Sequence, residues 1–157
     1  MENKKTISDL LLQHSGIRKA NVVAAFYPMK SEPDVVPFLR LLAGEGRLLL
    51  PRCGENCTME FFKVTDLYAD LASGAYGIKE PNEACKPWVG NIAVFLVPGV
   101  KFDRNGGRKG HGKGYYDRYL AKFPGSLKIG VCNAEQLQEE PLDLKEHDIL
   151  MDEVISV

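Results

Sequence analysis

The strongest chemical signal in this chain is a glycine-rich, basic segment at residues 104–117, with the sequence RNGGRKGHGKGYYD. Five glycines fall within the nine positions from 106 to 114, and Arg104, Arg108, Lys109 and Lys113 are interleaved with them. Glycine lets a ligand approach the backbone closely, so that successive N–H groups can converge on phosphate oxygens. The cationic side chains add charge-assisted hydrogen bonds. The segment therefore predicts a loop that binds an anion.

Regular elements are expected on both sides of this loop. Residues 91–97, with the sequence NIAVFLV, form a continuous apolar run that ends at Pro98 and Gly99, which is typical of a buried strand. Residues 115–120 contain no helix breaker, so we expect the loop to lead directly into a helix whose N-terminal amides also favour an anion. The predicted order is strand, glycine-rich loop, helix.

Two other interpretations of the segment are less favourable. Residues 107–113 satisfy the first seven positions of the P-loop pattern GxxxxGK[ST], but the eighth position is Gly114, which lacks the hydroxyl that would bind magnesium. A flexible, solvated basic loop is the second alternative. The two tyrosines and the aspartate that follow the loop directly argue against it.

Residues 97–120 resemble the signature of the 5-formyltetrahydrofolate cyclo-ligase family, whose members are also called 5,10-methenyltetrahydrofolate synthetases. In that signature a VPG, an aromatic residue, an aspartate and a GxRxGxGxGYYD run occur in the order seen here. Weaker matches flank it in the family's order, at residues 26–34, 51–52, 76–81, 129–130, 136–137, 147–148 and 152–154. The resemblance thus covers the chain from about residue 20 to its end.

Strand and helix patterns alternate along the chain. Strands are expected at residues 21–27, 47–50, 59–64, 92–97, 128–132 and 152–157, and helices at residues 8–15, 35–43 and from Tyr115 onward. This alternation predicts an α/β fold with a layered, Rossmann-like open sheet that is mostly parallel and has helices on both faces. We expect residues 1–157 to form a single domain, with ligands bound at the carboxyl ends of the strands.

Composition narrows the functional classes. The chain has 157 residues, 45% of them hydrophobic and 26% charged, and a net charge of −1, so neither nucleic acid nor an anionic membrane is expected as a partner. No apolar run approaches the length of a membrane span or of the core of a signal peptide, which favours a cytoplasmic location. We expect the protein to be a monomer or a weak homodimer. The four cysteines form no CxxC pair, so we expect incidental thiols and no zinc site.

The resemblance implies an ATP-dependent ligase that acts on 5-formyltetrahydrofolate. In the family's reaction, the γ-phosphoryl group of ATP is transferred to the formyl oxygen, N10 attacks the activated carbon, and phosphate leaves to give 5,10-methenyltetrahydrofolate. Such phosphoryl transfer is catalysed mainly by positioning and by neutralising charge. The small-molecule partners are therefore 5-formyltetrahydrofolate and ATP, with Mg²⁺ as the cofactor.

The resemblance also implies which residues form the site. The catalytic residues are Arg108, Lys113 and Tyr115. The ATP-binding residues come from the loop and the start of the helix, and they are Arg108, Lys109, Gly110, His111, Gly112, Lys113, Gly114, Tyr115 and Tyr116. The substrate-binding residues are Tyr27, Glu32 and Tyr115, with the Glu32 carboxylate suited to accept a pair of pterin N–H groups.

Asp117 and Asp148 are the implied Mg²⁺ ligands, because magnesium prefers hard oxygen donors and takes one or two carboxylates beside nucleotide phosphates. Asp103 and Asp152 are the substitutes. Some other residues keep two interpretations: Lys79 and Glu80 fit a pocket wall or a turn, Trp88 fits the core or a pocket wall, and Tyr119 fits core packing better than a site.

Two departures from the family pattern are visible. Family members usually carry a longer N-terminal segment whose Lys and Arg side chains reach the ATP phosphates, and here Lys4 and Lys5 are the available substitutes. His111 stands where the family often has an aromatic or basic residue. A second hypothesis is therefore a catalytically weak folate- or nucleotide-binding protein that keeps the fold.

Overall fold

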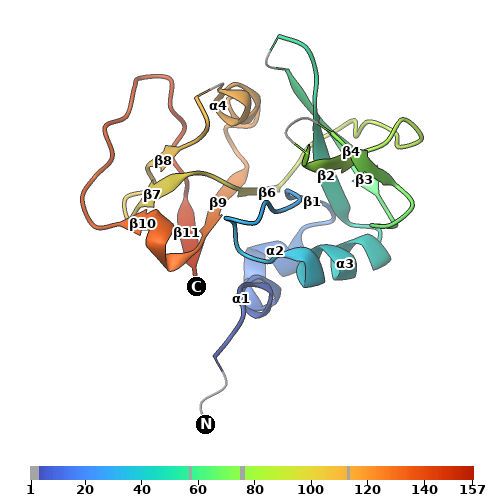
Figure 1. Ribbon diagram of the computed structural model, residues 1–157, viewed down its shortest axis with the longest axis horizontal. Helices are drawn as coiled ribbons and strands as arrows, with labels where there is room; N and C mark the ends of the chain where they lie inside the picture. The colour runs from blue at the N-terminus through green and yellow to red at the C-terminus, as the bar shows by residue number, and fades with distance from the viewer. Residues whose placement is uncertain (1–3, 57, 75–76, 113) are drawn as a thin grey trace.

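A six-stranded sheet forms the centre of the computed structural model, which describes residues 4–56, 58–74, 77–112 and 114–157 (Figure 1). The strand order is β11-β9-β6-β1-β2-β3. The strands are β1 (Val23–Ala24), β2 (Leu48–Cys53), β3 (Met59–Val64), β6 (Val94–Val97), β9 (Leu127–Cys132) and β11 (Glu153–Ser156). Neighbouring strands are parallel except for the antiparallel pair β2–β3. The predicted α/β fold with a mostly parallel open sheet is confirmed.

Alternate residues of the strands face two separate apolar cores. In β6, Val94 and Leu96 pack in the core that contains α1 (Ile7–Gln13), α2 (Ser15–Lys19) and α3 (Val36–Gly44). Phe95 and Val97 pack in the core on the other face, which contains Leu120 of α4 (Tyr115–Leu120). A strand buried on both faces has a continuous apolar sequence, which is why the run at residues 91–97 correctly predicted a buried strand. Helices cover both faces, as expected.

The helices begin where local hydrogen bonds satisfy their first amides. Thr6 and Asp9 form a capping box at the start of α1. The single helix expected at residues 8–15 is instead two short helices, because the His14 ring accepts hydrogen bonds from the amides of Gly16 and Ile17 and thereby caps α2. Strand β1 is also shorter than the strand predicted at residues 21–27, since only Val23–Ala24 form it.

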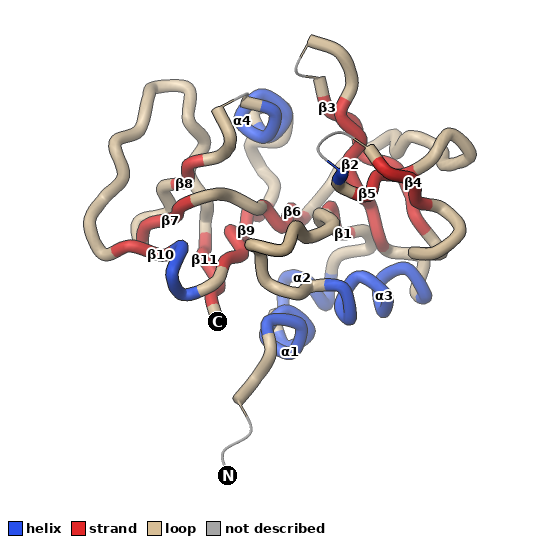
Figure 2. The backbone as a smooth tube through the Cα atoms, in the orientation of Figure 1, coloured by secondary structure: helices blue, strands red, loops and turns tan. Residues whose placement is uncertain are grey.

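Two small sheets were not predicted (Figure 2). One contains β7 (Lys101–Asp103), β8 (Arg108–Lys109) and β10 (Leu137–Gln138), the last following the 3-10 turn Ala134–Gln136. The other pairs β4 (Leu71–Ser73) with β5 (Lys79–Pro81). The expectation of one open loop from residue 104 is therefore wrong for its first half, because β7 and β8 pair as a hairpin around it.

The order of the strands creates a crevice. From β1 the chain passes to β2 on one side of it, whereas β6, the next parallel strand in the chain, lies on the other side of β1. Such a switch point separates the connections at the carboxyl ends of the strands and is where open α/β sheets bind ligands. The hairpin β7–β8 and α4 lie on one side of this crevice, and β4–β5 lies on the other (Figures 1 and 2).

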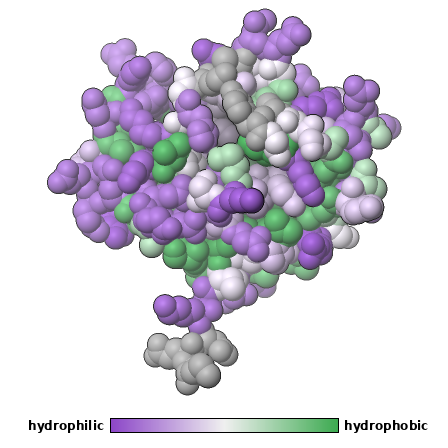
Figure 3. All heavy atoms as spheres, viewed as in Figure 1, coloured by the Kyte–Doolittle hydropathy of each residue, from purple (hydrophilic) through white to green (hydrophobic). Residues whose placement is uncertain are grey.

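One face of the molecule is mainly polar. On the face seen in Figure 3, hydrophilic side chains predominate and hydrophobic ones form only small groups. Among the described residues, no helix has the length and apolarity needed to cross a membrane.

Candidate active site

A cavity of about 600 Å³ opens at the switch point of the sheet. Its floor is formed by residues at the carboxyl ends of three neighbouring strands, namely Phe26 and Tyr27 after β1, Pro51 and Cys53 in β2, and Pro98 and Gly99 after β6. This volume lies in the range of small-molecule binding sites. The predicted location at the carboxyl ends of the strands is confirmed.

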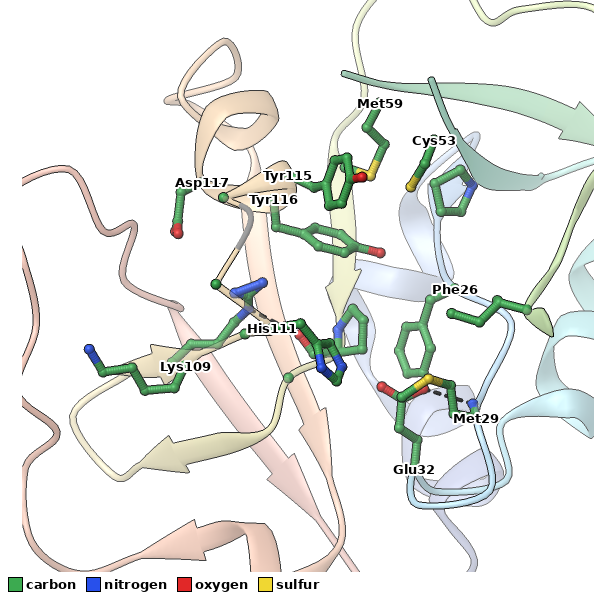
Figure 4. A pocket seen from close by; sticks show the side chains of 18 of the residues that line it. Phe26, Met29, Glu32, Cys53, Met59, Lys109, His111, Tyr115, Tyr116 and Asp117 are labelled. Carbon is green, nitrogen blue, oxygen red and sulfur yellow. Dashed lines mark hydrogen bonds between the residues drawn. The ribbon is translucent and has the colours of Figure 1, made fainter. Parts of the chain in front are cut away.

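Every predicted site residue that the structure describes lines this one cavity. On one wall are Arg108, Lys109, Gly110, His111, Gly112, Gly114, Tyr115, Tyr116, Asp117 and Asp148. On the facing wall are Tyr27 and Glu32 (Figure 4). Lys113 lies outside the described residues.

Arg108 is a fixed cation in the cavity wall. Its Nε donates to the carbonyl oxygen of Pro98 at 3.0 Å, and its guanidinium carbon lies 5.2 Å from the centroid of the Tyr116 ring. Burial lowers the pKa of Arg108, while the nearby Asp117 and Asp148 carboxylates oppose that shift. Because an arginine remains protonated in proteins, this wall keeps a positive charge that water screens only in part.

Tyr115 and Tyr116 occupy the first turn of α4. Gly114 precedes them with φ at +69°, a left-handed conformation that lets the loop turn sharply into the helix. Burial raises the pKa of Tyr116, so its hydroxyl stays neutral. Tyr119 instead packs on the rings of Phe61 and Phe95, at centroid distances of 5.1 and 6.0 Å, which confirms its predicted place in the core.

Asp117 and Asp148 are brought together although 31 positions separate them in the chain. Asp117 Oδ1 accepts from the amide of Ile149 at 3.0 Å, which fixes the residue next to Asp148 against α4. Asp148 Oδ2 accepts from the amide of Lys145 at 2.8 Å, and its side chain is 14% exposed. Each carboxylate therefore has one oxygen held by a backbone amide, and both residues line the cavity.

This pair suits a magnesium ion that is bound together with a nucleotide. Within the described part of the chain, no group of three or more His, Cys, Asp or Glu side chains is arranged to hold a metal. Magnesium usually takes one or two carboxylates and completes its shell with phosphate oxygens and water. Two carboxylates beside a cationic, glycine-lined wall fit that requirement.

The carboxylates of Asp103 and Asp152, the two substitute magnesium ligands, accept hydrogen bonds from backbone amides. Asp103 Oδ1 accepts from the amides of Asn105 and Gly107, and its Oδ2 accepts from the amide of Leu142, each at 2.8 Å. Asp152 Oδ2 accepts from the amide of Lys128 at 2.8 Å. Neither lines the cavity, so their assignment as alternative magnesium ligands is wrong.

Glu32 is held in place on the facing wall. Its Oε1 accepts from the amide of Met29 at 2.8 Å. Burial raises the pKa of Glu32, and the amide of Met29 and the charge of His111 act in the opposite direction. Figure 4 shows His111 reaching from the glycine-rich wall toward Met29 and Glu32. His111 therefore lies between the predicted anion site and the predicted pterin site.

Several lining residues were not predicted. The apolar ones are Phe26, Met29, Met59 and Ile78, and the polar ones include Lys145 and Cys53. Methionines carry no sequence signal for a pocket. Lys145 precedes the His147–Asp148 pair by only two positions, and this proximity is a sequence signal that places it near the site. Burial, together with Glu80, raises the pKa of the Cys53 thiol to about 11, so this cysteine is not a reactive thiolate at neutral pH.

The structure decides between the two interpretations that the sequence left open for Lys79, Glu80 and Trp88. Lys79 and Glu80 both line the cavity, which confirms the pocket-wall interpretation. Trp88 does not; it packs against the core, with its Nε1 donating to the carbonyl oxygen of Asn91 at 3.2 Å. Lys4 and Lys5 do not line the cavity either, and Lys5 Nζ donates to the Gln13 side chain, so neither lysine replaces a phosphate-binding cation here.

Comparisons with known proteins identify the family of this chain. The model of the 5-formyltetrahydrofolate cyclo-ligase family matches residues 1–157. A Schizosaccharomyces pombe protein described as a probable 5-formyltetrahydrofolate cyclo-ligase is 31% identical over 122 residues, which cover 67% of this chain and 60% of that protein. The Saccharomyces cerevisiae 5-formyltetrahydrofolate cyclo-ligase is 29% identical, with 96% of this chain and 82% of that protein covered.

A solved structure is similar over nearly the whole chain. The structure of the Aquifex aeolicus 5,10-methenyltetrahydrofolate synthetase matches with a TM-score of 0.81 and 34% sequence identity. The match covers 96% of this chain and 75% of that one.

Proposed function

Because this chain belongs to the 5-formyltetrahydrofolate cyclo-ligase family, we propose that it converts 5-formyltetrahydrofolate into 5,10-methenyltetrahydrofolate and uses ATP to do so. The observation that supports this most strongly is the composition of the cavity. It joins a glycine-rich cationic wall, a pair of carboxylates and a facing wall with a desolvated Glu32 in one volume of about 600 Å³. A phosphoryl donor, a divalent cation and a pterin each find matching groups there.

The glycine-rich wall is the proposed phosphate site. Arg108 and Lys109 supply positive charge, and the backbone of Gly110, Gly112 and Gly114 lets the phosphates come within hydrogen-bonding distance of the chain. Because Arg108 is already fixed by the Pro98 carbonyl and the Tyr116 ring, little reorganisation accompanies the build-up of charge on the transferred group.

The facing wall is the proposed folate site. The Glu32 carboxylate accepts hydrogen bonds from the pterin N–H groups, and its orientation is set by the Met29 amide. Tyr27 and Tyr115 line the same cavity and are the other proposed substrate-binding residues. In the proposed complex, the formyl oxygen of the substrate faces the terminal phosphoryl group of ATP.

The proposed reaction has two bond-forming steps. The formyl oxygen attacks the γ-phosphorus and displaces ADP, which turns a poor leaving group into a phosphate ester. N10 then attacks the formyl carbon, loses its proton, and expels inorganic phosphate, which leaves the carbon bridging N5 and N10. Both steps depend on holding the reacting atoms in line and on balancing phosphate charge.

Asp117 and Asp148 are the proposed holders of Mg²⁺. When bound, the ion would supply charge neutralisation at the phosphates. The protein's own part is to keep the two carboxylates in place, through the amides of Ile149 and Lys145. We extend the proposal to a single domain that acts in the cytoplasm as a monomer or weak homodimer, without nucleic acid or membrane as a partner.

The experiment that tests the proposal is a mixing assay. Purified protein is incubated with 5-formyltetrahydrofolate, ATP and Mg²⁺, and the ultraviolet absorbance of the methenyl product is followed. We expect product only when all three are present. If no product forms while calorimetry still detects folate binding, the chain is the catalytically weak binding protein instead.

A further inference from the structure

One lysine in the cavity lies apart from the cationic wall. Lys79 belongs to β5 of the β4–β5 hairpin, and it lines the cavity on the side of Tyr27. Its ammonium nitrogen lies 5.4 Å from the centroid of the Tyr27 ring, within the distance of a cation–π interaction. Strand β5 and the segment after β1 therefore place a positive charge and an aromatic ring side by side.

The position of Lys79 is fixed by its neighbours in the hairpin. Glu80 Oε2 accepts from the amide of Cys53 at 2.8 Å, and Arg52 donates to the carbonyl oxygens of Pro81 and Asn82 at 3.3 and 3.2 Å. These bonds join β5 to the end of β2. Because successive side chains of a strand point to opposite sides, fixing Glu80 on β2 also fixes the direction of Lys79.

The charges of the cavity are divided between its walls. Arg108, Lys109 and the two carboxylates Asp117 and Asp148 belong to the wall of β8, α4 and the segment after β10. On the facing wall, Glu32 is engaged by the Met29 amide and Glu80 by the Cys53 amide. Lys79 is exposed, and it brings an ammonium group to that wall.

We propose that Lys79, held beside the Tyr27 ring, binds a carboxylate of the glutamate tail of the folate substrate. This inference rests on the proposed function and assigns a further part of the substrate to the same cavity. The substrate consists of a pterin, an aminobenzoyl group and a glutamate. With the pterin at Glu32, the tail must leave along the facing wall toward solvent, where an ammonium on an aromatic surface suits a carboxylate.

The test compares two substrates that differ only in the tail. Wild type and Lys79→Met are assayed with 5-formyltetrahydrofolate and with 5-formyltetrahydropteroate, which lacks the glutamate. For the glutamate-bearing substrate we expect Lys79→Met to raise KM about tenfold with little change in kcat, because a partly exposed charge-assisted contact is lost. For the truncated substrate we expect the same KM in both proteins.

Two variants control the interpretation. Lys79→Arg keeps the positive charge and should retain most of the preference for the glutamate-bearing substrate. Lys63→Met removes an exposed lysine from the neighbouring strand β3 that does not line the cavity, and it should leave both KM values unchanged. A Lys79→Met protein whose KM rises equally for both substrates, or for neither, would overturn the proposal.

Loss of the proposed function is distinguishable from loss of this subsite. If wild type makes no product, the dissociation constants of the two compounds, measured by calorimetry, replace KM. A selective weakening of the glutamate-bearing compound in Lys79→Met then supports the subsite while the ligase activity is contradicted. Equal weakening, or no binding of either compound, overturns the subsite.

Discussion

The two halves of the glycine-rich segment have similar compositions and opposite environments. Gly106 and Gly107 in the first half are buried, and a Cβ added to them would lie 2.2 Å from the Met151 carbonyl oxygen and 2.3 Å from Asp103 Oδ2. In the second half a Cβ at Gly112 would meet nothing within 4 Å, and the glycines line the cavity. The first pair permits packing between segments, and the second half permits the approach of a ligand.

The first half nevertheless helps to build the site. Asp103 accepts from the amide of Leu142, and the Gly106 carbonyl accepts from the amide of Met151 at 2.7 Å. These two bonds hold both ends of the segment that carries Asp148. One motif can thus contribute to a site in two ways: its second half lines the cavity, and its first half positions the segment that carries Asp148.

Among these variants, Gly106→Ala is expected to lower the free energy of unfolding most. A small loss would contradict the difference between the two halves of the segment. The new methyl group would overlap the Met151 backbone, and the residue has φ at +93°, which disfavours alanine. We expect a loss of about 4 kcal/mol in the free energy of unfolding. Urea unfolding measures it, and a variant as stable as wild type would show that the first half is not a packing element.

Asp117→Asn tests the cavity side of the same motif. The amide keeps an oxygen that can accept from the Ile149 amide, so the fold should persist, while the negative charge offered to the metal is lost. We expect kcat to fall about a hundredfold or more, which is about 3 kcal/mol of transition-state stabilisation. Steady-state kinetics with the melting temperature as the control measure this; unchanged turnover would contradict the assigned role.

Asp103→Asn separates positioning from ligand contact. Burial by itself would raise the pKa of Asp103, but the amides of Leu142, Gly107 and Asn105 together hold it below its ordinary value of 3.8. The carboxylate therefore stabilises the fold above about pH 4, and this contribution disappears as the pH falls through the lowered pKa. At pH 7 we expect the variant to lose about 2 kcal/mol of stability.

The pH dependence provides the control for that variant. The stability difference between wild type and Asp103→Asn should shrink steadily in urea titrations performed below pH 4. A difference that does not depend on pH would mean that shape, and not charge, is what Asp103 contributes.

Gly112→Ala is the matched partner of Gly106→Ala. Its φ of +88° makes alanine strained by about 1 kcal/mol, but there is no atom to collide with. We expect a small fall in melting temperature and a rise in the KM for ATP. If Gly112→Ala were as destabilising as Gly106→Ala, the two halves would not differ.

Glu32→Gln is expected to have the smallest effect on stability, and with the opposite sign to Asp103→Asn. Burial raises the pKa of Glu32, so the ionised group opposes folding once the pH rises through that pKa. Glutamine keeps the acceptor for the Met29 amide, and it should add a few tenths of a kcal/mol of stability at pH 7 while folate affinity falls. Calorimetry and thermal melting together check this; stability lost at pH 7 would contradict it.

The sequence predicted the centre of the sheet because β6, at residues 94–97, is buried on both faces and is therefore a continuous apolar run. It did not predict β4, β5, β7, β8 or β10, since strands of two or three residues leave no measurable alternation. The predicted site residues that the structure describes line one cavity, and most of them belong to the glycine-rich motif, whereas Met29 and Met59 follow no pattern that marks a pocket.

By itself, then, the sequence determined the fold class, the motif and the chemical types that gather in the cavity, because these depend on local patterns of polarity and on residue chemistry. Only the tertiary structure decided which of several aspartates line the cavity. Asp103 and Asp117 stand in one motif. In the folded chain, Asp103 accepts from the amides of Gly107 and Leu142 and does not line the cavity, whereas Asp117 accepts from the amide of Ile149 and lines it. The same holds for the proposed role of Lys79, which depends on Tyr27: the two residues are more than fifty positions apart in the chain, and the Lys79 ammonium lies 5.4 Å from the centroid of the Tyr27 ring.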